Sequence, residues 1–378
     1  MTKCLTPWTN IDISPTGNIT PCCKFQMSEY DDKFNIIDCT IDKYRSSSFL
    51  KTIQSEMTQD KWPLGCVRCK TEEENNVLSK RQLDYSRWKE QYDSYDDQQG
   101  FIVASIAFGN VCNLKCITCG PKSSSRWRKE HKQLYNKDIK PIEFIDNITS
   151  EHIYSAMPNI IHFDIPGGEP FLSEVDKQKS LLNKYIQSGQ SKNITIHYTT
   201  NVQVYPGQDW WDLWKHFKEI DIQLSIDGIG ERYEYIRYPG KWSVCEENTK
   251  RYITMEEQIS NLKLSVSHTV SAYNIYYMDE FFNWCTGIGL PRPWCGRVHT
   301  PEHMRPSVYP VAVMKQISDN LMSSVNEDCH TWASLIENTD DSQYFPLFKT
   351  MKNKHDIYRG TNFAQTFPQI ERLNNGLQ

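Results

Sequence analysis

Short apolar segments alternate with amphipathic helical segments from about residue 100 onward. Strand-like runs fall at 101–107, 160–165, 193–199, 220–226, 262–270 and 294–299. Helical segments lie between them at 123–135, 173–187 and 209–217. Strands that alternate with helices form a parallel sheet with right-handed crossovers. The pattern therefore predicts an α/β fold, and the number of units predicts a partial (β/α)6 TIM-like barrel.

The two ends of the chain differ from this alternation. The first hundred residues are rich in cysteine, and a charged stretch over 71–100 is typical of a surface helix and linker. Residues beyond 300 have helical spacing and no cysteine motif. We expect a small cysteine-rich N-terminal domain at 1–95, the barrel at 96–300 and a helical C-terminal extension at 301–378.

Composition narrows the class of protein. The 378 residues carry a net charge of −5 with no basic tail, which argues against a long nucleic-acid partner. The longest apolar stretch is too short to span a bilayer, and the first residues lack the layout of a signal peptide. We therefore expect a cytoplasmic protein with no membrane partner. The 13 cysteines are odd in number, and in a reducing compartment they indicate metal binding or catalysis.

Three cysteines fall within eight residues directly after the first strand. Cys112, Cys116 and Cys119 form a C-x-x-x-C-x-x-C loop, which can hold three irons of a cluster and leave a fourth iron open for substrate. The alternative is a structural zinc loop, which needs a fourth ligand close by. No fourth cysteine or histidine lies within the loop.

Polar and glycine-rich motifs follow the next three strands. The carboxyl ends of barrel strands meet at one rim, where active sites lie. Two glycines allow a close approach of the backbone to a ligand, a glutamate accepts from an ammonium group, and serine, asparagine and aspartate suit ribose hydroxyls. Each motif alone is also compatible with an ordinary strand-end turn. The candidates are Gly167, Gly168, Glu169, Thr200, Asn201, Ser225 and Asp227.

Together these motifs resemble the radical S-adenosylmethionine (SAM) enzymes. CNLKCITC at 112–119 is similar to the signature cluster loop, GGEP at 167–170 to the motif that holds the methionine amino group, and SIDG at 225–228 to a ribose-contacting strand end. The resemblance covers about residues 100–300. It implies a 4Fe-4S cluster whose open iron binds SAM, reductive cleavage of SAM and hydrogen abstraction from a substrate. Thr118 departs from the family, which often has an aromatic or large residue there near the adenine.

The same resemblance suggests three further contacts to SAM. The family places an arginine near the carboxylate of SAM, and Arg237 is preferred here over Arg232. Val270 and Asn274 lie in a stretch that resembles the adenine pocket after the fifth strand.

A second cysteine set precedes the barrel. A glycine-containing hairpin presents Cys22, and Cys4, Cys66 and Cys69 complete four thiols, for which spacing alone allows zinc or iron-sulfur. The arrangement resembles the SPASM or twitch auxiliary-cluster module, which favours one auxiliary 4Fe-4S cluster with these four ligands. Cys23 is the adjacent alternative to Cys22, and Cys39 is expected to be a small buried residue.

The resemblance implies a SAM-cleaving oxidoreductase whose substrate is a peptide, modified by oxidation, cross-linking or epimerisation. Its partners would be SAM and a reductant such as flavodoxin or ferredoxin. Two alternatives stay open: a nucleotide or sugar substrate, and a non-catalytic iron-sulfur or SAM sensor. Catalytic side chains beyond the cofactor contacts are not identified. Trp210, Trp211, Trp214 and Tyr198 could line a cavity or fill a core, which is the commoner role of aromatic residues.

Overall fold

The computed structural model describes residues 4–30, 34–74, 78–140 and 149–376. The chain divides into two compact units. The first unit comprises Met1–Val111, Pro141–Tyr198 and Pro206–Asp221, and the second comprises Cys112–Lys140, Thr199–Tyr205 and Ile222–Gln378.

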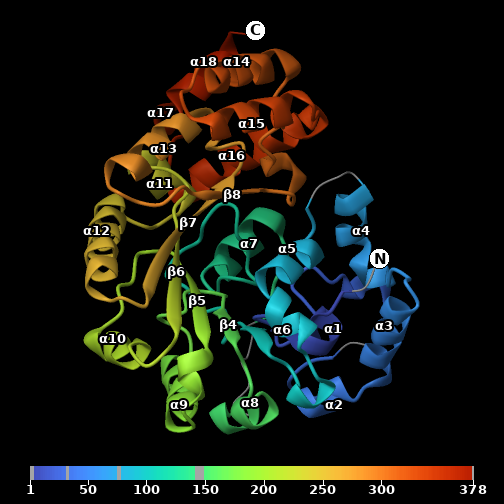
Figure 1. Ribbon diagram of the computed structural model, residues 1–378. Coiled ribbons are helices and arrows are strands. Elements are labelled where there is room, and N and C mark those ends of the chain that lie inside the picture. The colour runs from blue at the N-terminus through green and yellow to red at the C-terminus, as the bar shows by residue number, and fades with distance from the viewer. Residues whose placement is uncertain (1–3, 31–33, 75–77, 141–148, 377–378) are drawn as a thin grey trace. The chain divides into compact units, whose positions relative to one another are not determined.

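Strands and helices alternate along most of the chain (Figure 1). The described strands are β1 (Asn10–Ile13), β2 (Ile19–Thr20), β3 (Val103–Ile106), β4 (His162–Ile165), β5 (Thr195–Thr200), β6 (Glu219–Ser225), β7 (Leu262–Val270) and β8 (Trp294–Arg297). The helices up to β6 are α1 (Thr6–Thr9), α2 (Ile41–Arg45), α3 (Ser48–Thr58), α4 (Val67–Glu74), α5 (Lys80–Arg87), α6 (Lys89–Asp93), α7 (Trp127–Tyr135), α8 (Ser150–Ala156), α9 (Val175–Gln187) and α10 (Gln208–Trp214). Those after β6 are α11 (Gly230–Ile236), α12 (Trp242–Gln258), α13 (Met278–Gly287), α14 (Val311–Met322), α15 (Glu327–Glu337), α16 (Phe345–Arg359), α17 (Phe363–Thr366) and α18 (Pro368–Asn375).

The strands form one sheet in the order β2-β1-β3-β4-β5-β6-β7-β8. The pairs β1–β3, β3–β4, β4–β5 and β7–β8 are parallel, and β1–β2 is antiparallel. All six strands that the apolar runs predict are present, and the described residues after 301 are helical as expected. Closure of the sheet into a partial barrel stays a prediction.

The N-terminal segment contributes two strands that the sequence analysis did not assign to the sheet. Residues Asn10 to Ile13 pair in parallel with Val103 to Ile106, and a turn with Gly17 at φ +80° leads into β2. The predicted glycine-containing hairpin ahead of Cys22 is thus confirmed. The run NIDI is short and half polar, and this is why periodicity alone did not identify it as a strand.

Local signals explain several helices of the first unit. The Ser47 side chain accepts from the Leu50 amide and starts α3, whose Phe49, Leu50, Ile53 and Met57 are buried on one face. Ser79 and Gln82 form a capping box at α5. Directly after α5, Trp88 and Tyr92 pack on Ile102 and Val103 at the start of β3.

The tryptophans of α10 fill a core. The Tyr198 ring lies 5.9 Å from that of Trp210 and 5.3 Å from that of Trp214, and Phe171 packs on all three. Trp211 is also buried. The expectation that these aromatic residues fill a core is therefore confirmed. Cys39, Cys245, Cys285 and Cys329 are buried as well.

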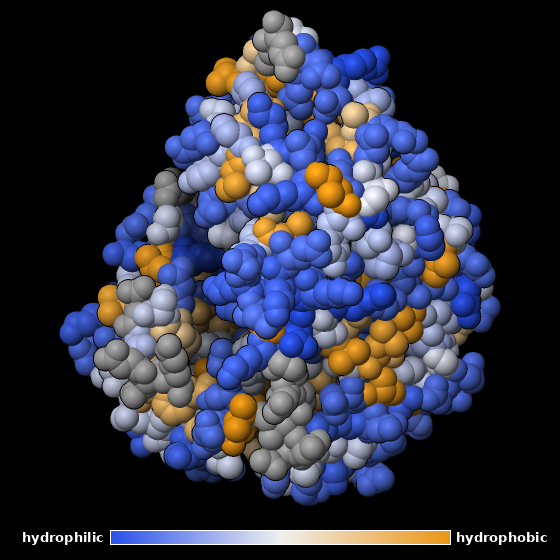
Figure 2. All heavy atoms as spheres, turned by 180° about the vertical axis from the view of Figure 1, so that it is seen from behind, coloured by the Kyte–Doolittle hydropathy of each residue, from blue (hydrophilic) through white to orange (hydrophobic). Residues whose placement is uncertain are grey.

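Large hydrophobic side chains at the surface are scattered, and the face in Figure 2 is mostly hydrophilic with small hydrophobic groups. None of the described helices combines the length and apolarity that a bilayer crossing requires.

One face of the sheet in the first unit carries a row of polar side chains. Asp12, Ser105, Asp164 and His197 occupy neighbouring register positions on β1, β3, β4 and β5. Ser105 Oγ donates to Asp164 Oδ2 at 3.1 Å, and His197 Nδ1 donates to Asp221 Oδ2 at 2.8 Å. Buried apolar residues flank each of them along the strands. This alternation is that of a sheet with one apolar and one polar face.

Within this row, the titration of Asp12 makes the free energy of unfolding depend on pH. Burial raises the pKa of Asp12 to about 6 and the nearby Asp164 adds to the rise, while Ser105 and Lys80 only partly oppose it. The folded chain therefore binds this proton more tightly than the unfolded chain, and the resulting stabilisation is lost as pH rises from about 4 through about 6. We expect Asp12→Asn to stabilise the protein by about 1–3 kcal/mol at pH 8 and by much less at pH 5.

Thermal unfolding at the two pH values measures this difference. Asp38→Asn, at an exposed position, is the control and should leave the melting temperature unchanged at both. Identical melting of wild type and Asp12→Asn at pH 8 would contradict the assignment.

Candidate functional site

The three-cysteine loop lies in the second unit, between β3 and α7. Within it, the Cys119 amide donates to the Cys116 carbonyl at 3.0 Å. Asn201, after β5, donates through Nδ2 to Asn113 Oδ1 at 2.7 Å and lies 3.6 Å from Cys112 Sγ. The structure therefore brings the predicted Asn201 into contact with the predicted Cys112.

Backbone hydrogen bonds hold the loop against the segment after α11. The Lys115 amide donates to the Tyr238 carbonyl at 2.6 Å, and the Ile117 amide donates to the Ile236 carbonyl at 2.7 Å. Trp127 Nε1 donates to the Cys116 carbonyl at 3.0 Å. Two amides and one carbonyl of the loop thus have partners elsewhere in the second unit.

Arg237 lies between the two residues that accept these bonds. Its Nη2 is 2.8 Å from Asp227 Oδ2, and Asp227 Oδ1 accepts from the Thr269 amide at 2.7 Å. Both side chains are buried, so each charge depends on the other for compensation. Asp227, predicted to contact ribose, orients Arg237 in this structure.

The three cysteines of the loop are half-buried. Burial raises the pKa of Cys116 to about 12, and Arg237 partly opposes this rise. Burial likewise raises the pKa of Cys119 to about 11. Iron-sulfur ligation requires thiolates, so a cluster would replace these protons, and the Arg237 cation would stabilise the resulting negative charge. The donor set of three thiols on one short loop fits a cluster with three protein ligands.

The predicted glycine pair belongs to the first unit and directly follows β4. Gly167 has φ +93° and Gly168 has φ +55°. A Cβ atom at Gly168 would lie 2.3 Å from the carbonyl oxygen of Val111, the residue before Cys112. The Glu169 amide donates to this same oxygen at 2.8 Å, and the Glu169 side chain is buried. Only glycine allows the two chain segments to approach this closely.

The remaining predicted cofactor residues have mainly backbone partners. Thr200 is buried and its Oγ1 accepts from the Val202 amide, whereas Ser225 is half-buried at the end of β6. Val270 is fully buried. Asn274 donates through Nδ2 to the Asp227 and Thr269 carbonyls, so its amide supports the backbone around Asp227. Contact of these side chains with SAM stays a prediction.

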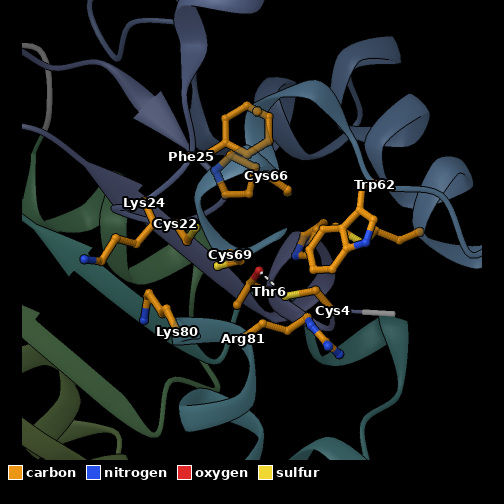
Figure 3. A pocket seen from close by; sticks show the side chains of 14 residues that line it. Cys4, Thr6, Cys22, Lys24, Phe25, Trp62, Cys66, Cys69, Lys80 and Arg81 are labelled. Atoms are coloured by element: carbon orange, nitrogen blue, oxygen red, sulfur yellow. Dashed lines mark hydrogen bonds between the residues drawn. The ribbon is translucent and has the colours of Figure 1, made fainter. Parts of the chain in front are cut away.

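A second set of thiols lines one pocket of the first unit (Figure 3). The pocket is lined by all four predicted auxiliary ligands, namely Cys4, Cys22, Cys66 and Cys69. They come from the chain start, the end of the β1–β2 hairpin and the beginning of α4. Cys23, the sequence alternative to Cys22, does not line the pocket. Of these two neighbouring cysteines, Cys22 is therefore the one that shares a pocket with Cys4, Cys66 and Cys69.

Cations surround this four-cysteine pocket. Lys24, Lys80 and Arg81 line it together with Phe25 and Trp62 (Figure 3). Burial raises the pKa of Cys66 to about 12, and the neighbouring Cys4 and Cys69 add to the rise. The cations would offset part of the charge of four thiolates. Sequence reasoning missed these three residues, because single basic residues are usually solvated, in helices such as that of Lys80 and Arg81 as elsewhere.

Among the residues that the structure describes, no three histidine, cysteine, aspartate or glutamate side chains are close enough to hold a single metal ion.

Comparisons with known proteins are distant. No family model matches the chain, and no curated protein matches it. A structure of native anSMEcpe with bound AdoMet has a TM-score of 0.40 and 16% identity over 51% of this chain and 51% of that chain. Streptococcus suis SuiB bound to S-adenosylmethionine has a TM-score of 0.39 and 12% identity over 82% and 68%. TYW1 with a lysine-pyruvate adduct has a TM-score of 0.33 and 13% identity over 62% and 73%.

The chain spans about half the length of the anSMEcpe chain.

The glycine pair yields a test of close packing. We expect Gly168→Ala to destabilise the protein by at least about 2 kcal/mol more than Gly189→Ala. Gly189 also has a positive φ of +80°, but a Cβ atom there meets nothing within 4 Å, so its replacement costs only about 1 kcal/mol for the left-handed backbone. Chemical denaturation of both variants measures the difference. Equal losses would show that the contact with Val111 does not constrain position 168.

Proposed function

We propose that this chain is a radical SAM enzyme whose loop cysteines Cys112, Cys116 and Cys119 hold a 4Fe-4S cluster with one open iron. The observation that carries the proposal is the contact of Asn201 and the 236–238 segment with this loop. Four parts of the chain that are far apart in sequence thereby belong to one hydrogen-bonded assembly. They are the cysteine loop, Asn201, Asp227 and the 236–238 segment with Arg237. The bound cluster and SAM would supply one-electron cleavage of the sulfonium and hydrogen abstraction from a substrate.

The chain's own residues would bind and orient SAM. Glu169 is a buried carboxylate next to two left-handed glycines, and it would accept from the methionine ammonium group. Arg237, fixed by Asp227, would hold the carboxylate of SAM or balance the thiolates. Asn201 and Ser225 would bind the ribose hydroxyls, and Thr200, Val270 and Asn274 would keep the surrounding backbone in place.

We further propose that Cys4, Cys22, Cys66 and Cys69 hold one auxiliary 4Fe-4S cluster. Their shared pocket and its three cations support this ligand set over one that includes Cys23. Four protein ligands leave no iron open, so the auxiliary cluster would transfer electrons and would not bind substrate.

The substrate class rests on sequence alone. The resemblance of the first hundred residues to a SPASM or twitch module favours a peptide substrate and a modification of the oxidation, cross-linking or epimerisation type. The electrons would come from a reductant such as flavodoxin or ferredoxin. The peptide substrate and the reductant both belong to the proposal.

The loop cysteines are tested by SAM cleavage. Protein prepared without oxygen should hold about eight irons per chain, four for each cluster, and should release 5′-deoxyadenosine with SAM and dithionite. Replacing Cys112, Cys116 or Cys119 by alanine should abolish this release and remove about four irons. No cleavage by fully loaded wild-type protein would refute the enzyme and leave a sensor.

The auxiliary ligands are tested by the neighbouring pair Cys22 and Cys23. Cys22→Ala and Cys66→Ala should each lose about four irons per chain and keep SAM cleavage, because the loop cluster remains. Cys23→Ala is the matched control and should keep about eight irons. Tetrahedral zinc in place of the auxiliary cluster, seen by metal analysis of the aerobic and anaerobic protein, would contradict the iron-sulfur assignment.

A further inference from the structure

Glu130 of α7 is a fully buried carboxylate that gathers donors from two distant parts of the second unit. Lys115 Nζ lies 2.8 Å from its Oε2, and Lys115 stands between Cys112 and Cys116. His355 Nδ1 and Arg359 Nε, both on α16, donate to its Oε1 at 3.1 and 2.7 Å. Glu130 therefore connects the cluster loop with the C-terminal helices.

Arg359 also binds the loop directly. Its Nη2 donates to the Lys115 carbonyl at 2.8 Å, while the Lys115 amide donates to Tyr238 on the other side. The Arg359 guanidinium lies 5.1 Å from the Trp127 ring, and Trp127 Nε1 binds the Cys116 carbonyl. These contacts connect α16 with the backbone of Lys115 directly and with the Cys116 carbonyl through Trp127.

The network carries a net positive charge beside the loop. Burial alone would raise the pKa of Glu130, but His355, Arg359 and Lys115 outweigh it and hold the pKa at about 2. Burial lowers the pKa of His355, and its hydrogen bond to Glu130 only partly opposes this. Two cations, Lys115 and Arg359, thus face one carboxylate. A net positive charge near a cluster favours its more negative, reduced form.

We infer that Arg359, seated by Glu130, is a positioning residue for the cluster loop, so that the C-terminal helix α16 sets the loop's hold on its cluster and the cluster's reduction potential. This inference rests on the proposed function of Cys112, Cys116 and Cys119. It assigns a role to the helical C-terminal extension, for which the sequence offered none. Arg359 acts through Lys115 and the loop backbone.

The test compares Arg359→Gln with Lys352→Gln. Lys352 lies on the same helix and pairs with Glu371 at 3.4 Å, so its replacement removes one cation of α16 without touching the loop. The loop cluster is identified in the reduced protein as the electron-paramagnetic-resonance signal that shifts when SAM is added. Its loss to an iron chelator and its midpoint potential are then measured in each protein.

We expect Arg359→Gln to lose the loop cluster to the chelator at least about tenfold faster than wild type, because outer-shell contacts typically contribute 10- to 100-fold to metal affinity. Its midpoint potential should shift to a more negative value, because a nearby positive charge is removed. Arg359→Lys, which keeps the charge, should recover most of the potential but not the chelator resistance. Lys352→Gln should match wild type in both measurements.

A wild-type chelation rate and midpoint potential in Arg359→Gln would overturn the inference, even if the variant melts at a lower temperature. Should Arg359→Gln fail to fold, Lys115→Met removes the other cation from the loop side and carries the same expected outcomes. If the wild type holds no cluster that Cys112→Ala removes, the proposed function itself fails, and that outcome is distinct from an unaltered Arg359→Gln.

Discussion

The pairing of the cysteine loop with the 236–238 segment is the interaction on which the candidate site depends. Two short backbone hydrogen bonds, at Lys115 and Ile117, join segments more than a hundred residues apart in sequence. Because Arg237 lies between the two accepting carbonyls, the same pairing places its guanidinium beside Asp227. Asp227 in turn accepts from the Thr269 amide, and Asn274 binds the carbonyls on either side. A change at any of these points reaches the loop through a short series of hydrogen bonds.

Several strands were predictable because apolar residues that become buried recur at alternate positions, as at 219–225 and 262–270. NIDI at the first strand was not, since two of its four residues are polar and its partner lies some ninety residues later. The row of polar side chains across the sheet could not be predicted from the sequence either. Asp12, Ser105, Asp164 and His197 lie on four different strands, and only the register reveals that they are neighbours.

The site residues differ in whether their role can be inferred without knowing where each side chain points. Cysteines at fixed spacing indicate ligands whatever way the chain turns, and the four thiols predicted from the first hundred residues do line one pocket. An amide or carboxylate gives no such signal. Asn274 and Asp227 bind the protein's own backbone in this structure, and the sequence does not specify which partner such a polar group meets. The choice between Cys22 and Cys23 depended in the same way on the direction of two successive side chains.

The parallel pairing of β1 with β3 has a consequence for how this chain can be divided. The cysteine-rich start of the chain supplies the neighbour of the first long-range strand, so a fragment that begins near residue 96 would expose the backbone amides and carbonyls of Val103–Ile106 along an open edge. Such an edge recruits other strands, and the fragment would tend to aggregate. Exchange of the N-terminal segment between related proteins would therefore have to preserve a strand as well as four thiols.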